Sequence, residues 1–153
     1  MKSILFALVS LLFVSCLSDG GTSKSIDYTV QNEKEIVDYV AKNKLTATRT
    51  DSGLFYIVNE PGTGAHPTAT SNVTVAYKGY FTNGNVFDQS KPEGISFGLQ
   101  QVIKGWTEGI PQFKAGGSGL LLIPARLGYG SNDSGPIPAG SVLIFEVKLI
   151  SVN

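Results

Sequence analysis

Hydrophobic residues recur at helical spacing over one short stretch in the first third of the chain. The apolar positions are Ile36, Val37, Val40 and Ala41, and the pattern continues to about Lys44. Asn32, followed three residues later by Glu35, is typical of a helix start with the Asn32 side chain as N-cap. The pattern therefore predicts a short amphipathic N-terminal helix and a linker over residues 32–50. Its apolar stripe packs either on its own domain, which a helix of this length favours, or on a second copy of the chain.

Beyond residue 51 the spacing changes to that of β-strands. Residues 72–81 place apolar Val73, Val75 and Tyr77 at every second position, the period of a half-buried strand. Asn83-Gly84 predicts a hairpin whose second strand begins at Val86. Further strand-like runs cover residues 54–58, 95–97, 119–123 and 142–150, and residues 102–110 predict one short helix before Pro111. We expect one α+β domain over residues 51–153, a mostly antiparallel sheet with a short helix across its face.

The N-terminus has the pattern of a targeting segment. Lys2 supplies a positive start, and residues 4–14 are almost unbroken apolar. Such a run of about 11 residues is shorter than the roughly 20 that span a bilayer, which favours a cleaved signal peptide over residues 1–15. The segment that follows, residues 16–31, contains the small, polar, Gly-rich stretch 18–25 and predicts a flexible tether.

Cys16 is the single cysteine of the chain and comes directly after the apolar run. The stretch Leu12-Phe13-Val14-Ser15-Cys16 resembles a bacterial lipoprotein box, in which the thiol receives a diacylglyceryl group. The alternative, a plain secretory signal with an incidental cysteine, leaves this lone thiol unexplained. We expect lipidation at Cys16 and a domain anchored to a membrane of the bacterial cell envelope, outside the cytoplasm. The pattern leaves open which membrane holds the anchor.

The charge balance argues against nucleic acid as a partner. The chain has 12 Lys and Arg residues against 12 Asp and Glu residues, and no basic stripe that could release counterions from phosphates. The single histidine, His66, has no second ligand or nucleophile to act with. We therefore expect no metal site and no cofactor.

Aromatic, aliphatic and acidic residues gather on the strand-like and helix-like runs of the second half. A cup of rings with one carboxylate and one or two phenols suits an uncharged, apolar ligand held by a few directed hydrogen bonds. The residues are Tyr77, Phe87, Asp88, Val102, Ile103, Trp106, Tyr129, Ile137 and Phe145. An aromatic on an apolar run is by default a core residue, so the pattern by itself leaves core and pocket both open.

Several motifs, in order along the chain, resemble those of the FKBP-type peptidyl-prolyl cis-trans isomerases. The resemblance runs from about Gly53 to Val152, and such agreement is far more specific than any one motif. The motifs are Val75-Ala76-Tyr77-Lys78-Gly79, Asn83-Gly84, Val86-Phe87-Asp88-Gln89-Ser90, Val102-Ile103-Lys104-Gly105-Trp106-Thr107-Glu108-Gly109, Ile123-Pro124, Leu127-Gly128-Tyr129-Gly130, Ile137-Pro138 and Leu143-Ile144-Phe145-Glu146-Val147. The resemblance implies a curved antiparallel sheet wrapped around the short helix, with the active pocket between them.

The resemblance also implies roles for individual residues. Trp106 would be the pocket floor on which a proline ring lies, and the phenol of Tyr129 and the backbone N–H of Ile103 would bind substrate carbonyls. Asp88 would lie beside the carbonyl of the bond being turned, with Tyr77 completing the catalytic group. The remaining substrate-binding residues would be Phe87, Ile95, Phe97, Val102, Ile137 and Phe145.

The implied activity is cis–trans isomerisation of X–Pro bonds in unfolded or partly folded polypeptides outside the cytoplasm, with macrolide inhibitors as further ligands. The alternative is a non-catalytic chaperone or binding module of the envelope, which includes a structural part of a gliding-motility assembly. Whether the protein is a monomer or a dimer stays open.

Two segments depart from the best-known relatives. Lys91-Pro92-Glu93-Gly94 is shorter, and the arginine that pairs there with the carboxylate matched by Asp88 has no counterpart. We therefore expect Asp88 to depend on Tyr77 for its orientation. The loop of residues 131–136 carries Asp133 where some relatives carry an aromatic ring. The relatives' substrate preference around the proline therefore cannot be transferred to this chain.

Overall fold

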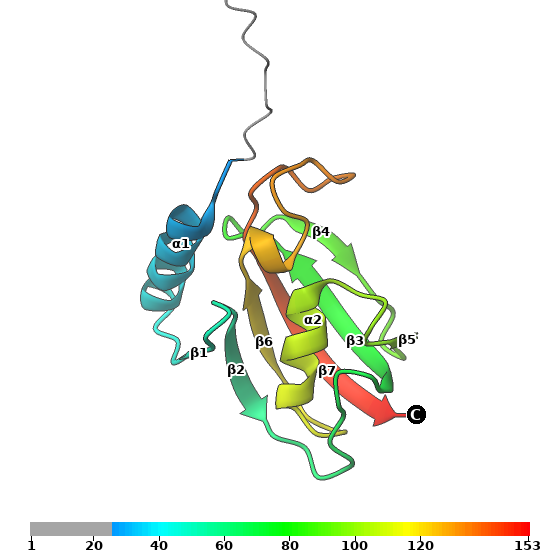
Figure 1. The fold of residues 1–153 in the computed structure, drawn as a ribbon. Helices are drawn as coiled ribbons and strands as arrows, with labels where there is room; N and C mark the ends of the chain where they lie inside the picture. Colours follow the sequence, from blue (N-terminus) through cyan, green and yellow to red (C-terminus); the bar gives the residue numbers. More distant parts are fainter. Residues whose placement is uncertain (1–25) are drawn as a thin grey trace, which may run out of the picture.

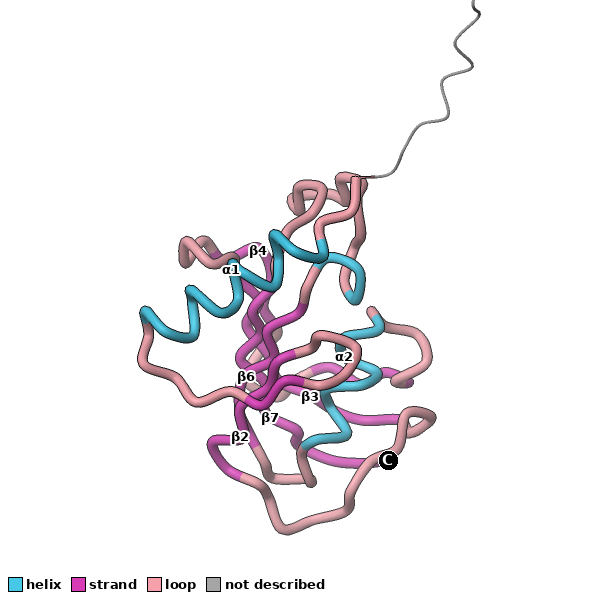
Figure 2. The backbone as a smooth tube through the Cα atoms, turned by 60° about the vertical axis from the view of Figure 1, so that its left-hand side comes forward, coloured by secondary structure: helices cyan, strands magenta, loops and turns pink. Residues whose placement is uncertain are grey.

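The computed structural model describes residues 26–153, which form one antiparallel β-sheet with a helix on each face (Figures 1 and 2). The predicted signal peptide, Cys16 and most of the predicted tether lie outside the described residues. The helices are α1 (Thr29–Lys42) and α2 (Lys104–Gly109), with short 3-10 turns η1 (Ile110–Gln112) and η2 (Ala125–Leu127). The strands are β1 (Thr48–Arg49), β2 (Phe55–Glu60), β3 (Asn72–Tyr80), β4 (Val86–Gln89), β5 (Ile95–Gly98), β6 (Ser118–Ile123) and β7 (Leu143–Val152).

The last strand of the chain lies in the middle of the sheet. The order is β1-β2-β6-β7-β3-β4, with β5 also pairing with β3, and every pairing is antiparallel. β7 therefore joins a half made of β1, β2 and β6 to a half made of β3, β4 and β5. The antiparallel α+β fold expected from the sequence is confirmed, and only the two-residue strand β1 was not predicted.

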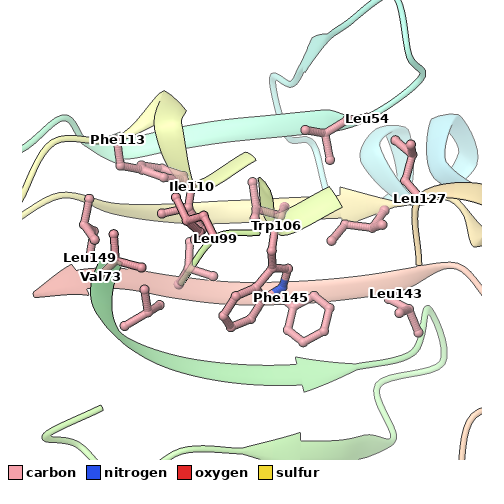
Figure 3. Packing of buried hydrophobic residues seen from close by; sticks show 14 of the residues in the cluster. Leu54, Val73, Leu99, Trp106, Ile110, Phe113, Leu127, Leu143, Phe145 and Leu149 are labelled. Carbon is pink, nitrogen blue, oxygen red and sulfur yellow. The ribbon is translucent and has the colours of Figure 1, made fainter. Parts of the chain in front are cut away.

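The larger hydrophobic core lies between the sheet and α2. Phe145, Val147 and Leu149 alternate along β7 and belong to the same buried cluster as Trp106 of α2, and Figure 3 shows Phe145 beside Trp106. The helix approaches the sheet closely because two of its positions are glycines. A Cβ built on Gly105 would lie 2.5 Å from the side chain of Ile123. This close contact fixes the distance between Trp106 and the sheet.

A smaller core lies on the opposite face, between the sheet and α1. Figure 2 shows α1 and α2 on opposite sides of the strands. Ile36 is fully buried there and packs with Phe55, Leu122, Val142 and Ile144. α1 thus packs on its own domain, as favoured from the sequence. Among residues 26–153, neither helix is long and apolar enough to cross a membrane.

The start of α1 differs from the prediction. The helix begins at Thr29, and Asn32 is not its N-cap but an interior residue whose side chain is 1% exposed. The Asn32 amide bonds instead to Ala125 and Gly140, 93 and 108 residues further along the chain. An asparagine side chain can bond either to backbone groups nearby in the sequence or to distant ones, and here the distant partners fix the position of Asn32.

Candidate active site

A cavity of about 770 Å³ opens between α2, the sheet and the loop that follows η2. All eleven residues predicted to form a pocket line it. They are Tyr77, Phe87, Asp88, Ile95, Phe97, Val102, Ile103, Trp106, Tyr129, Ile137 and Phe145. Residues from β3, β4, β5, α2, β7 and two loops thus converge on one concave surface, which we call the pocket.

Trp106 forms the floor of the pocket. Its ring is enclosed on its sides by other aromatics, and the residue is only 5% exposed. Tyr77 and Phe145 meet it edge-on at centroid distances of 5.0 and 5.2 Å, and Phe97 lies at 5.3 Å. Edge-to-face contacts at these distances are the favoured arrangement of aromatic rings. The floor is therefore held rigidly while the indole still borders the cavity.

One glycine makes room for the aromatic wall. Gly79 lies on β3 opposite Phe145 of β7 and Asp88 of β4. A Cβ at Gly79 would lie 2.7 Å from the ring of Phe87 and 2.8 Å from that of Phe145. Because no side chain occupies this position, these two rings meet edge-on at 5.5 Å.

The carboxylate of the pocket is oriented by a phenol, as expected from the sequence. The Tyr77 hydroxyl donates to Asp88 Oδ2 at 2.6 Å, and the Gln89 N–H donates to Asp88 Oδ1 at 2.8 Å. Among residues 26–153, the ion pairs found do not include Asp88. Burial, and then the hydrogen bond to Asp88, raise the pKa of Tyr77 to about 12. The phenol therefore stays protonated and keeps donating at neutral pH.

The rim of the pocket is built from two loops. Tyr129 stands between Gly128 and Gly130 just after η2, and its side chain is 43% exposed. Val102 and Ile103 immediately precede α2, and the Ile103 carbonyl accepts the first helical hydrogen bond from Trp106 N–H at 2.9 Å. The N–H of a residue at this position is outside the hydrogen bonds of its helix.

Sequence reasoning missed four residues that also line the pocket: Gln101, Ser134, Gly135 and Pro136. The last three form a tight turn closed by hydrogen bonds between Ser134 and Ile137. The Ser-Gly-Pro composition predicts a turn, but nothing in it shows which way the turn faces. Glu108 of α2 lies outside the pocket, and its carboxylate accepts a hydrogen bond from the Ser52 hydroxyl at 2.6 Å.

The architecture and the pocket define a class: an antiparallel sheet enclosing a short helix, with an apolar, aromatic-floored cavity between them. The family model described as FKBP-type peptidyl-prolyl cis-trans isomerase matches residues 64–150. The chain belongs to this family, as the resemblance in its motifs predicted. Every pocket residue lies inside the matched range.

Relatives of known name agree with this assignment. The FKBP-type peptidyl-prolyl cis-trans isomerase FkpA of Aeromonas hydrophila is 42% identical over 128 residues, which cover 81% of this chain and 48% of the relative. FkpA of Escherichia coli strain K12 is 42% identical over 122 residues, covering 78% of this chain and 45% of the relative. The chain thus spans about half the length of these relatives.

Solved structures show the same fold. The crystal structure of FkpA from Escherichia coli superposes with a TM-score of 0.68 at 38% identity, covering 81% of this chain and 63% of that one. A peptidyl-prolyl cis-trans isomerase from Pseudomonas syringae superposes with a TM-score of 0.70 at 32% identity, covering 82% and 96% of the two chains.

Proposed function

We propose that the protein is a prolyl isomerase that accelerates rotation about X–Pro bonds in unfolded or partly folded polypeptides. The observation that carries the proposal is the rigid aromatic floor at Trp106. The Tyr77–Asp88 pair borders this floor, and the exposed Tyr129 stands at the open rim of the cavity. A proline ring on the indole would place its preceding amide between these polar groups.

The physical chemistry of amide rotation suits such a pocket. The barrier is about 18–20 kcal/mol because the planar amide has partial C–N double-bond character. A twisted amide has lost that conjugation and has a smaller dipole than the planar one. A dry, apolar pocket therefore disfavours the planar ground state relative to the twisted transition state. Each tenfold gain in rate requires only about 1.4 kcal/mol, so no covalent step and no proton transfer is needed.

We assign the roles of the polar groups accordingly. The Ile103 N–H and the Tyr129 hydroxyl bind peptide carbonyls and hold the segment across the floor. The Asp88 carboxylate, fixed by Tyr77, faces the carbonyl of the rotating bond. The aliphatic residues Ile95, Val102 and Ile137, together with the rings of Phe87, Phe97 and Phe145, exclude water from the proline.

A peptide isomerisation assay tests the proposal. The chain without its first 16 residues should accelerate isomerisation of a short proline peptide, and Phe87→Leu and Asp88→Leu should each slow it about tenfold or more. Val86→Ala is the matched control, since Val86 neighbours Phe87 on β4 but is 48% exposed and lies outside the pocket. If the peptide binds but its isomerisation is not accelerated, the protein is a non-catalytic binding module and not an isomerase.

We propose further that the protein is a lipoprotein of the bacterial cell envelope, anchored through Cys16. The support is the apolar run of residues 4–14, the small Ser15 before the cysteine, and the absence of any other cysteine in the sequence. The mature protein isolated from its host should carry the mass of acyl chains on Cys16, and Cys16→Ser should abolish that mass and release the protein from membranes. An unmodified Cys16 thiol in the mature protein would contradict the anchor.

Macrolide inhibitors are proposed as ligands of the same pocket. The turn of residues 91–94 closes through a hydrogen bond from Gly94 N–H to the Lys91 carbonyl at 2.9 Å, and the side-chain partner of Asp88 is Tyr77. Because a macrolide would occupy the same cavity as the peptide, it should inhibit isomerisation by competing with the peptide. Inhibition that is independent of peptide concentration would place the macrolide elsewhere.

A further inference from the structure

Four hydrogen bonds form a closed ring that connects α1 to the rim of the pocket. The Ala125 N–H donates to Asn32 Oδ1 at 2.8 Å, and the Gly130 N–H donates to the Ala125 carbonyl at 2.7 Å. The Gly140 N–H donates to the Gly130 carbonyl at 2.9 Å, and Asn32 Nδ2 donates to the Gly140 carbonyl at 2.9 Å. We call this set the Asn32 ring. Asn32 supplies its only side chain, and the other members are backbone groups.

The ring encloses the segments that build the rim. Tyr129 directly precedes Gly130, so its backbone is fixed by a ring member on its C-terminal side. The turn of residues 134–137, which lines the pocket, lies between Gly130 and Gly140. The segment of residues 125–140 has further local hydrogen bonds, such as that from the Gly128 N–H to the Ala125 carbonyl at 2.9 Å and that from the Ala139 N–H to Asp133 Oδ1 at 2.8 Å, but these do not connect it to α1. The ring therefore restrains Tyr129 where regular secondary structure does not.

The Asn32 side chain is itself held in place by a docked helix. One turn further along α1, Ile36 is fully buried against the sheet. On the same helix Glu33 accepts two hydrogen bonds from the Arg49 guanidinium, at 2.7 and 3.0 Å, and Glu35 accepts one from the Thr82 hydroxyl at 2.6 Å. α1 is thus attached to both halves of the sheet, and Asn32 extends from a fixed support.

The chemistry of the position requires an amide. Ala125 offers a donor and Gly140 offers an acceptor, and both meet a side chain that is 1% exposed. Asparagine supplies an acceptor oxygen and a donor NH2 in a single planar group. Aspartate would keep the acceptor but would present a lone pair to the Gly140 carbonyl, and alanine would leave both backbone groups unpaired.

We propose that Asn32 is a positioning residue for Tyr129, acting through the ring. This rests on the proposed isomerase function, to which it adds a part for the N-terminal helix outside the matched range 64–150. The competing interpretation is that Asn32 only docks α1 and contributes to stability alone.

Kinetics separate the two interpretations. Asn32→Ala should lower kcat/KM for a proline peptide about tenfold, since small displacements of a positioning group have large kinetic effects. In the Tyr129→Phe background the same change should cost less than about twofold, because the group that it positions has been removed. An equal loss in both backgrounds would overturn the proposal.

Phe113→Leu is the matched control, because it lowers stability at a fully buried position that lies neither in the ring nor in the pocket, and that belongs to the core on the opposite face of the sheet from α1. Measured where all variants are fully folded, it should leave kcat/KM unchanged, and a loss equal to that of Asn32→Ala would also overturn the proposal. If Asn32→Ala does not fold, Asn32→Ser takes its place, since it leaves a neutral polar group that cannot satisfy both Ala125 and Gly140.

Amide hydrogen exchange provides a readout that does not need activity. In Asn32→Ala the N–H groups of Gly130 and Gly140 should exchange about tenfold faster relative to those of β7, and in Phe113→Leu this ratio should not change. An unchanged ratio in Asn32→Ala would disprove the ring as a restraint. If the wild-type protein accelerates no peptide, the proposed function fails, and the exchange experiment still decides whether Asn32 restrains Tyr129.

Discussion

The phenol of Tyr77 links the stability of the fold to the polar side of the pocket. It is half-buried against Trp106 and donates to Asp88, and both features favour its neutral form. The folded-state pKa of about 12 lies above the ordinary value of 10. The folded protein therefore holds this proton to higher pH than the unfolded chain.

This pKa difference predicts a loss of stability in alkaline solution. The contribution of Tyr77 is complete below pH 10 and is lost as the pH rises through about 12. Urea unfolding across this range should show a shallower fall of the free energy of unfolding in Tyr77→Phe than in the wild type. Burial also raises the pKa of Tyr80, but Tyr80 is present in both proteins. Its contribution therefore cancels when the two stability curves are compared. If the curves of unfolding free energy against pH are parallel for the two proteins, the pKa of Tyr77 is the same in the folded and unfolded states.

Gly79 provides a second prediction about a single position. A methyl group there meets the rings of Phe87 and Phe145 at 2.7 and 2.8 Å, and both rings line the pocket. Gly79→Ala should cost about 1–3 kcal/mol of unfolding free energy by overpacking, and should weaken peptide binding. Lys78→Ala, at an exposed neighbouring position of β3, should change neither quantity beyond about 0.5 kcal/mol. Unaltered peptide affinity in Gly79→Ala would mean that the rings yield without closing the pocket.

Helix α1 contributes to the stability of the domain. It covers a hydrophobic patch of Phe55, Leu122 and Ile144 that would otherwise face water. Ile36→Ala should therefore cost about 2–4 kcal/mol of unfolding free energy, measured by chemical denaturation, because the site is fully buried. Val37→Ala is the control on the outer side of the same helix, where the side chain is 48% exposed. Equal losses in the two variants would contradict the docking of α1 through Ile36.

The regular elements could be predicted because their periodicity is local. The alternation in residues 72–81 and the Asn83-Gly84 hairpin define β3 and β4, and the helix before Pro111 is the observed α2. β1 has two exposed residues, too few to show a period. Asn32 was misassigned because its partners, Ala125 and Gly140, are distant in sequence and give no local signal.

The pocket could be predicted wherever a residue belongs to a motif with fixed neighbours, such as Phe87-Asp88 or Trp106. Ser134, Gly135 and Pro136 were missed because turn composition determines the bend and not its direction. The Ser52–Glu108 hydrogen bond joins a turn to α2, and no sequence periodicity relates the two residues. Contacts made by irregular segments are thus the part of the structure that sequence patterns do not predict.

For the molecule as a whole, the sheet depends on its last strand. β7 pairs with β6 over six residues and with β3 over eight, and it supplies Leu143, Phe145 and Leu149 to the main core. Removal of residues 143–153 should therefore abolish the cooperative unfolding transition and the dispersion of the amide NMR spectrum. Removal of Asn153 alone, which bonds only to Asn72 and Thr74 at the strand end and to Ser151, should cost about 1 kcal/mol. A folded truncated chain would show that the two halves assemble without β7.

The central place of β7 has a consequence for biosynthesis. A ribosome makes β7 after the other strands of this sheet, so both halves of the sheet are synthesised before the strand that joins them. A nascent chain at that point carries unpaired strand edges beside exposed apolar faces, the features that promote aggregation. The sheet therefore closes only once β7 is available, and a catalyst proposed to serve unfinished chains passes through the same aggregation-prone state itself.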